Sequence, residues 1–406
     1  MLRTTYGVLL SHDAGMTWRW LCEDVLGVLS NSTTDPVLAM TTGSIVGGPG
    51  LTAGLFVSPD GGCNWAMAAA PLSDVLTKDL VVRPGAPDAV LALTSTYAPH
   101  AGADGGPGYS QQVYASVDDG ASWSAFGTPI DPSALATSIE LAASDTSRVY
   151  ISTIRGANAA RTASLFVSTD AGASWTERPV PIDPNSEAEI YVGAVDPMNA
   201  DRVYVRTLGQ PSRLLVTSDA GQTYQSALSL SGQMLGFALS PDGSKVYAGS
   251  IEDGLFAATR DSLAFQHVSA VHVQCLAAHG ADLWACSDEP SGFVAGVSSD
   301  DGATFTARAH LQAQPPIACA ADASAAQCSG APLQALCAQL PGCDSDGGRA
   351  AAATNDGGAR EIPSPGKARG CSAAGHAEGA VALAAIGGFA AIAAWGRRRR
   401  RSRSER

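Results

Sequence analysis

Apolar and polar residues alternate along this chain in short segments that recur at similar distances. One recurring segment alternates small or charged residues with β-branched and aromatic ones, at residues 148–151, 202–205, 245–248 and 282–285. A period of two is typical of a half-buried β-strand. More continuous apolar segments precede two of these, at residues 189–195 and 234–239, and they predict inner strands. The pattern therefore predicts an all-β chain built from short strands.

The strand segments are punctuated by one motif, Ser/Thr-x-Asp-x-Gly-x-Ser/Thr/Asn-aromatic. Its six copies lie at residues 11–18, 58–65, 116–123, 168–175, 217–224 and 298–305, so their starts are 47, 58, 52, 49 and 81 residues apart. The last interval holds a degenerate copy, in which Thr259, Asp261 and Phe265 remain but Leu263 replaces the glycine. A fixed period of about 40 to 60 residues indicates a repeat architecture whose units bury their faces against neighbours.

The residue types of the motif suit a tight turn followed by a strand. Asp carboxylates and Ser or Thr hydroxyls bond the backbone N–H groups of turns, glycine adopts positive φ without strain, and an aromatic ring buries a large area. The residues expected to have these structural roles are Asp13, Asp60, Asp118, Asp170, Asp219, Asp300, Gly15, Gly62, Gly120, Gly172, Gly221, Gly302, Trp18, Trp65, Trp123 and Trp175.

The motif resembles the Asp-box, or BNR, repeat of sialidases, sortilin-type receptors, some xyloglucan hydrolases and photosystem assembly factors, which are all β-propellers. The resemblance implies a propeller over residues 1–316, with the boxes on outer hairpins and their Asp residues structural. Six boxes and the degenerate copy predict seven blades of four strands. The hairpin at residues 259–265 should be distorted, because its turn glycine is lost. The family gives a fold but leaves the function open.

The first blade is incomplete in the sequence. Only residues 4–10 and the strand after Trp18 precede the next repeat, so its inner strands must come from elsewhere or be missing. Residues 316–320 are the candidate for a strand supplied by the other end of the chain, which would remove an unpaired sheet edge. The alternative is that a longer N-terminus has been lost.

Cysteine content favours an exported protein. Eight cysteines precede Cys371, an even number compatible with four disulfides in an oxidising compartment: Cys22, Cys63, Cys275, Cys286, Cys319, Cys328, Cys337 and Cys343. We expect Cys275 to pair with Cys286 across a hairpin, and Cys22 with Cys63 between neighbouring blades. The last four cysteines are separated by nine, nine and six residues without a Cys-x-x-Cys pair, so we expect no metal, and no cofactor is indicated.

A short module and a linker follow the propeller. Residues 317–343 are predicted to form a Cys-rich closing segment with one amphipathic helix that packs on the propeller, with Cys337 on its buried side. The helix pattern consists of Pro332, Leu333, Leu336, Cys337 and Leu340, ended by Pro341 and Gly342. Residues 344–370 are rich in Gly, Ala, Asp and Pro and predict a flexible linker.

The last part of the chain, residues 371–406, carries a hydrophobic segment. Residues 379–396 contain no charge and as a helix would span on the order of 27 Å, close to the roughly 30 Å hydrocarbon core. The order of Cys371, apolar helix and terminal Arg cluster resembles the MYXO-CTERM sorting signal of myxobacterial surface proteins. The resemblance implies a precursor held in the inner membrane until a processing enzyme acts near Cys371, and a mature protein at the cell surface or outer membrane. A permanent C-terminal membrane anchor is the alternative.

The start of the chain lacks the basic region and long apolar run of a secretory signal. We therefore expect the start to be truncated or misplaced, with a cytosolic tail-anchored protein as the alternative. The net charge is −13, and the last ten residues carry seven Arg and one Glu, so subtracting that +6 leaves −19 on the rest. So acidic a body disfavours binding to nucleic acid.

Two classes of function remain. The first is a non-catalytic, surface-displayed module that binds an unknown protein or glycan through loops at residues 94–112 and 155–162. The second is a glycoside hydrolase of the sialidase or xyloglucanase type, which needs an arginine cluster with a Tyr-Glu pair, or two carboxylates. The candidates for such a site are Arg83, Arg155, Arg206, Asp196, Glu252 and Asp288. We expect the first class, with no catalytic residues.

Overall fold

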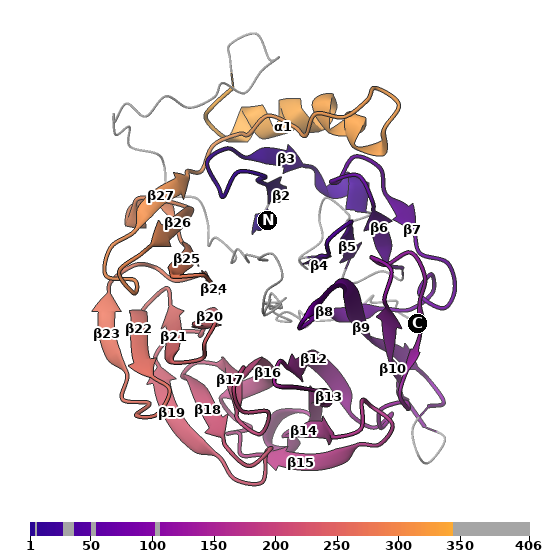
Figure 1. The fold of residues 1–406 in the computed structure, drawn as a ribbon, viewed down its shortest axis with the longest axis vertical. Helices are drawn as coiled ribbons and strands as arrows, with labels where there is room; N and C mark the ends of the chain where they lie inside the picture. The colour runs from indigo at the N-terminus through magenta and orange to yellow at the C-terminus, as the bar shows by residue number, and fades with distance from the viewer. Residues whose placement is uncertain (5, 27–35, 50–53, 102–105, 344–406) are drawn as a thin grey trace, which may run out of the picture.

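A computed structural model describes residues 1–4, 6–26, 36–49, 54–101 and 106–343. In these residues seven antiparallel sheets form a ring about a central axis (Figure 1). Six sheets have four strands, and their innermost strands β4, β8, β12, β16, β20 and β24 face the axis. The prediction of an all-β, seven-bladed propeller is confirmed.

The blades follow one another in sequence. Blade 1 contains β1 (Leu2–Thr4), β2 (Gly7–Leu10) and β3 (Arg19–Leu21), and blade 2 contains β4 (Val37–Met40), β5 (Ile45–Gly48), β6 (Phe56–Ser58) and β7 (Ala66–Met67). Blade 3 contains β8 (Thr77–Arg83), β9 (Ala86–Ala98), β10 (Gly108–Ser116) and β11 (Ser124–Phe126), and blade 4 contains β12 (Leu135–Ala142), β13 (Asp145–Arg155), β14 (Thr162–Ser168) and β15 (Thr176–Val180). Blade 5 contains β16 (Glu187–Val195), β17 (Val203–Gly209), β18 (Ser212–Thr217) and β19 (Gln225–Leu230), and blade 6 contains β20 (Gly236–Leu239), β21 (Lys245–Ser250), β22 (Gly254–Thr259) and β23 (Gln266–Ser269). Blade 7 contains β24 (Cys275–His279), β25 (Asp282–Cys286), β26 (Ala295–Ser298) and β27 (Thr306–Ala309).

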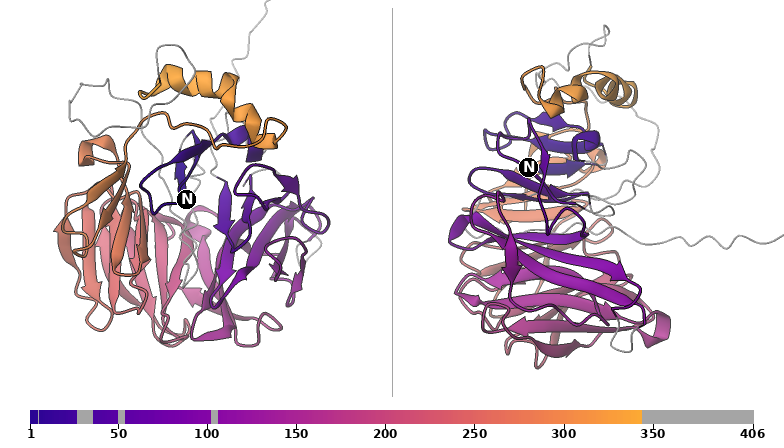
Figure 2. Two further views of the ribbon diagram at one scale, coloured as in Figure 1. Left: turned by 45° about the horizontal axis from the view of Figure 1, so that its top comes forward. Right: turned by 90° about the vertical axis from the view of Figure 1, so that its right-hand side faces the viewer.

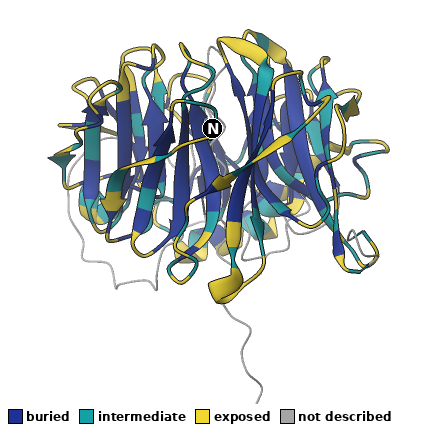
Figure 3. Cartoon of the chain, turned by 90° about the horizontal axis from the view of Figure 1, so that it is seen from below, coloured by how far each residue is buried: buried dark blue, intermediate teal, exposed yellow. Residues whose placement is uncertain are grey.

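The core lies between neighbouring blades. Alternate side chains of each strand point to opposite sheet faces, so every blade packs on both neighbours. Between blades 3 and 4, for example, Val81 and Leu91 pack with Ile139 and Ile151, and all four are buried. Figure 3 shows this division, with buried strands and exposed turns.

Strand direction sorts the connections onto two faces. Because neighbouring strands are antiparallel, the turns between third and fourth strands and between first and second strands share one face, which we call the box face. The connections between second and third strands, and those between blades, share the other, which we call the top face. All six boxes therefore lie on the box face.

Blade 1 is closed on its outer side. The box at residues 11–18 joins β2 to β3, so these strands hold the third and fourth positions, and the described residues supply no innermost strand. The Trp20 amide donates to the Pro315 carbonyl at 2.9 Å, and the Ile317 amide donates to the Trp20 carbonyl at 3.0 Å. This pairing is parallel. The expected closing segment thus reaches the expected blade, but it pairs with the outer edge and supplies no inner strand.

A short helix covers this closure. Helix α1 (Ala331–Gln339) lies across the outer side of β3 (Figures 1 and 2). It buries Leu333 and Leu336 in the core of blade 1, while Cys337 is half-buried against the same cluster. The predicted amphipathic helix is therefore present with the expected face toward the propeller. The described residues also contain four 3₁₀ turns, at Glu23–Leu26, Asn158–Ala160, Glu289–Ser291 and Ser324–Ser329.

Four disulfides join the eight cysteines before Cys371. Cys275 bonds Cys286, as expected, because the two stand opposite each other on β24 and β25. The expected pair of Cys22 with Cys63 is wrong. Both bond the closing segment, in Cys22–Cys328 and Cys63–Cys319, and Cys337–Cys343 closes the end of α1. A bond across 306 residues contributes about 6 kcal/mol in the chain-entropy description.

The six boxes form turns of one geometry. In the box of blade 4, the Ser168 hydroxyl donates to Asp170 at 2.8 Å and accepts the Gly172 amide at 2.7 Å. Asp170 in turn accepts the Ser174 amide and hydroxyl, at 2.9 and 2.6 Å. These hydrogen bonds lower the pKa of Asp170, and the bond from the Ser174 hydroxyl has the largest effect. The turn requires positive φ at Gly172, where φ is 83°.

The degenerate box departs from this geometry, as expected from its missing glycine. Leu263 stands at the glycine position with φ of 48°, a conformation that is strained for a branched side chain. The Thr259 hydroxyl bonds Ser262 at 2.8 Å, and Asp261 instead pairs with Arg260 at 3.2 Å. The sheet itself keeps four strands, so the distortion is confined to the turn.

Removal of a box hydroxyl should weaken its hairpin and leave function intact. Ser168→Ala leaves the buried Gly172 amide without its acceptor, so we expect the free energy of unfolding to fall by about 1 to 2 kcal/mol. Asp170→Ala should lower the melting temperature for the same reason. Thermal and denaturant unfolding measure both effects. Loss of ligand binding by Asp170→Ala at an unchanged melting temperature would contradict a structural role.

Candidate functional site

The three arginines proposed for a carboxylate-binding cluster do not come together. Arg83 lies over the Phe126 ring, 5.9 Å from its centroid. Arg155 is held by Asp131 at 2.8 Å and by Glu177. Arg206 is buried and donates to the Met234 and Leu235 carbonyls at 3.0 and 3.1 Å. Each guanidinium therefore has a structural contact of its own in a different blade.

The three candidate acids are also dispersed. Asp196 follows β16 on the box face, where it is fully buried and accepts the Met198 amide at 2.8 Å. Glu252 and Asp288 lie on the top face, in the connections after β21 and β25. Asp288 contacts His272 Nδ1 at 2.8 Å and accepts the Ser291 hydroxyl at 3.1 Å. These acids therefore form no pair for glycoside hydrolysis.

The long top-face loops prove to be extended hairpins. β9 continues to Ala98 and β10 begins at Gly108, so much of residues 94–112 is paired strand. The Gly-rich composition suggested a loop, but Tyr97 and Tyr109 are strand formers and stand opposite each other. Their rings meet edge to face with centroids 6.3 Å apart, and Tyr97 is 60% exposed. Likewise β13 and β14 extend through Arg155 and Thr162.

A cluster of charged side chains on the inner strands was not expected from the sequence. Asp79 on β8 and Glu140 on β12 are buried near the axis. Asp79 accepts the Ile139 amide of the next blade at 2.9 Å and the Leu80 amide at 2.9 Å. Farther round the ring, the Ser138 hydroxyl accepts the Val192 amide at 2.8 Å. These bonds connect blades 3, 4 and 5 at their inner edges.

Burial controls the ionisation of this cluster. It raises the pKa of Asp79 to about 7, against the opposing effect of the two amide donors. It also raises the pKa of Glu140 well above its ordinary value, and the neighbouring charge of Asp79 acts in the same direction. The Glu140 Oε1 atom has no hydrogen-bond partner in the described part of the chain. Both acids are therefore poised to hold a proton in the folded protein.

A tyrosine and a glutamate lie beside these acids. The Tyr191 hydroxyl donates to Glu189 Oε2, and both residues belong to β16. Burial first, and then the Glu189 charge, raise the pKa of Tyr191 well above its ordinary value. Such a phenol is a poor nucleophile at neutral pH unless Glu189 takes its proton. The pair thus has the residue types of a sialidase-type nucleophile, while Arg206 is committed to backbone carbonyls.

The sequence signal for this cluster is weak but present. Asp79, Glu140 and Glu189 each adjoin apolar residues within an inner strand. A charge at such a position is expensive to bury and indicates a specific role. The strand pattern alone did not show that β8, β12 and β16 would bring these side chains to one side of the ring.

Metal sites and membrane spans are both absent from the described ranges. No group of three His, Cys, Asp or Glu side chains in the described ranges is placed to hold a metal ion. In those ranges no helix has the length and apolar character needed to cross a membrane. Cys371 and the segment 379–396 lie outside the described residues.

The acid cluster predicts a pH dependence of stability. Because the folded-state pKa of Asp79 exceeds its unfolded value of about 3.9, its contribution is complete at low pH and is lost as pH rises toward 7. Asp79→Asn removes this titration and keeps one acceptor oxygen. We therefore expect the variant to gain stability relative to wild type between pH 5 and pH 7, measured by denaturant unfolding. Asp145→Asn, at an exposed turn, is the control, and a constant difference for Asp79→Asn would refute the assignment.

Comparison with known proteins concerns the fold. No protein-family profile and no curated protein matches the sequence. Among solved structures, the chain is similar to an ancestral GH74 enzyme, with 16% identity and a TM-score of 0.48 over 74% of this chain and 42% of that one. It is also similar to YCF48 bound to D1 peptide, with 14% identity and a TM-score of 0.36 over 69% of this chain and 71% of that one. A third similar structure is YCF48 from Cyanidioschyzon merolae, with 10% identity and a TM-score of 0.34 over 60% of this chain and 68% of that one. The chain thus spans less than half of the GH74 enzyme's length. The β-propeller assignment rests on the seven sheets of this chain itself.

Proposed function

We propose that this chain is a non-catalytic, exported β-propeller of the Asp-box type that binds a protein or glycan through its top face. The observation that carries the proposal is the exposed Tyr97, packed against the half-buried Tyr109 on the β9–β10 hairpin. Tyrosine is enriched in binding hot spots because its ring gives a large contact area at low entropic cost. The paired strands beneath hold the two rings in one geometry before a ligand arrives.

The engagement of the charged groups supports a non-catalytic role. Arg155 and Arg206 already bind internal partners, and Asp79 already accepts hydrogen bonds from two backbone amides. A catalytic group must reach the reacting atom of its substrate. The alternative is a glycoside hydrolase, for which the supporting observation is the hydrogen bond between Tyr191 and Glu189 near the axis.

The disulfides support export. Every cysteine before Cys371 is paired, and two of the bonds attach the closing segment to blades 1 and 2. Such bonds persist in oxidising compartments. We propose that the tail then holds the precursor in the inner membrane, and that a processing enzyme acts near Cys371 to display the protein on the cell surface.

Replacement of the exposed tyrosine should weaken ligand binding. A glycan array and a peptide array, probed with wild type, identify the ligand. Tyr97→Ala should then reduce affinity at least about tenfold, because truncation of a hot-spot ring costs roughly 2 kcal/mol or more. Met198→Ala, at an exposed position on the box face, is the matched control. Equal affinity of Tyr97→Ala and wild type would exclude the top-face site.

The same protein can be assayed on sialidase and xyloglucan substrates. Hydrolysis that disappears in Tyr191→Phe would support the enzyme in place of the binding module.

The tail proposal has its own test in a native-type host. Mass spectrometry of surface protein should find a C-terminus at or near Cys371, and Cys371→Ser should leave full-length precursor in the inner membrane. Intact peptides covering residues 380–397 in surface material would instead support a permanent anchor.

A further inference from the structure

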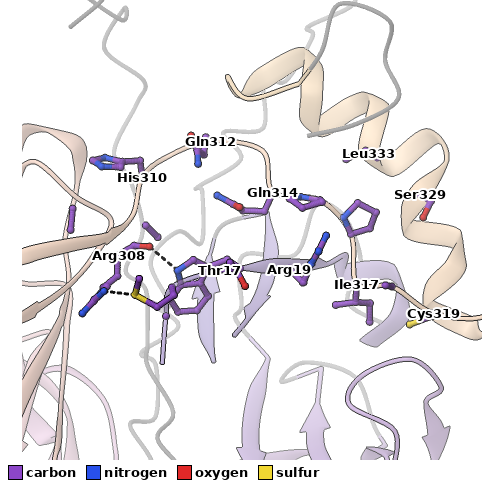
Figure 4. Close-up of a pocket in the computed structure, with 18 of the residues that line it drawn as sticks. Thr17, Arg19, Arg308, His310, Gln312, Gln314, Ile317, Cys319, Ser329 and Leu333 are labelled. Atoms are coloured by element: carbon purple, nitrogen blue, oxygen red, sulfur yellow. Dashed lines mark hydrogen bonds between the residues drawn. The ribbon is translucent and has the colours of Figure 1, made fainter. Parts of the chain in front are cut away.

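A cavity of about 830 Å³ lies where the ring closes between blades 7 and 1. Three parts of the chain build it: the box turn of blade 1, β27 with the segment that follows it, and the start of the helical module. Figure 4 shows Thr17 and Arg19 on one side, with Gln312 and Gln314 above them on the segment that follows β27. The volume is within the range of roughly 300 to 1,000 Å³ that small-molecule sites occupy. We call it the seam cavity.

The seam cavity is cationic in an acidic protein. Its lining contains Arg19, Arg308 and His310 and no Asp or Glu, although the chain carries a net charge of −13. Neither guanidinium has a carboxylate partner within the described ranges, whereas His310 lies 3.3 Å from Glu289. Figure 4 places Arg308 and Arg19 on either side of Thr17. Two separated cationic groups therefore face the same space without internal neutralisation.

Polar groups of the lining lack internal partners. Gln314 is only 8% exposed, and its side chain makes no hydrogen bond to any described residue. Its amide oxygen and nitrogen keep solvent contact, so both can hydrogen-bond a molecule in the cavity. In Arg308, Nη1 donates to Met16 Sδ at 2.6 Å and Nε is buried, so Nη2 is the guanidinium nitrogen left for a ligand. These groups are available to a bound molecule.

The remaining lining is apolar and is held in place. Trp18, Pro315 and Ile317 contribute carbon surface between the polar groups. The Trp18 indole donates to the Arg308 carbonyl at 2.8 Å, and residues 315–317 are bonded to β3. The cavity is therefore preformed by the closure of the ring.

We propose that the seam cavity binds a short acidic oligosaccharide that carries carboxylates. Arg19 and Arg308 bind the carboxylates, since guanidinium groups form strong charge-assisted bonds with them. The side-chain amides of Gln312 and Gln314 donate and accept hydrogen bonds, which matches sugar hydroxyls. The Thr17 hydroxyl donates to Asp13 at 2.7 Å and can accept a hydrogen bond from the sugar. Proline and tryptophan carbons cover the C–H face of the sugar. The site is separate from the Tyr97 hairpin and does not depend on the ligand proposed for the top face.

The test measures binding of trigalacturonate to the full chain with its disulfides formed, by titration calorimetry. Maltotriose supplies a neutral sugar of the same size, and triglutamate supplies similar charge without sugar hydroxyls. We expect trigalacturonate to bind at least tenfold more tightly than either. Arg19→Gln should weaken its binding about tenfold, and Gln314→Leu should weaken it with the charge unchanged.

Arg178→Gln is the control, because it makes the same charge change on β15, far round the ring in blade 4. Arg19 is exposed, so Arg19→Gln should fold even where a substitution of half-buried Arg308 does not. Three results would overturn the proposal. They are absence of trigalacturonate binding at millimolar concentration, equal binding of triglutamate, and equal weakening by Arg178→Gln and Arg19→Gln.

Discussion

The parallel pairing of residues 315–317 with β3 is the contact on which the ring depends. Each blade buries both faces against neighbours, so an opening anywhere exposes two apolar faces at once. Blade 1 is the weak point, because its sheet has three strands in the described residues. The closing segment adds backbone hydrogen bonds at Trp20, the helix covers the outer edge, and two disulfides fix both. Closure is thus secured from outside the ring.

The fold was predictable because its signals are local and repeated. Every box combines a carboxylate, a hydroxyl, a glycine and an aromatic ring within eight residues, and each part acts on its own turn. The amphipathic helix at Leu333 and Leu336 was predictable for the same reason. The long-range disulfide pairing was not predictable from the sequence. Cys22 and Cys63 are near in sequence, but both bond residues more than 250 positions away, and nothing in the local pattern distinguishes these partners.

The candidate sites were less predictable than the fold. Tyr97 lies in a segment whose Gly-rich composition suggested a loop. In the structure it is paired with Tyr109 on the next strand. Asp79 and Glu140 look like ordinary charged positions of a strand until the ring places them on its inner edge. The seam cavity combines residues near both ends of the described chain, such as Arg19 and Gln314, and only the closed ring brings them together. Sites of this kind follow from topology, which a linear pattern does not contain.

The position of the closing segment also orders the maturation of the molecule. A chain that emerges N-terminus first can stack blades 2 to 7 on one another as they appear, but the thiols of Cys22 and Cys63 must wait for Cys328 and Cys319. Their oxidation is therefore among the last steps of assembly. A chain that ends early keeps two free thiols and an open sheet edge. Reactive thiols therefore mark an incomplete molecule in the compartment where it folds.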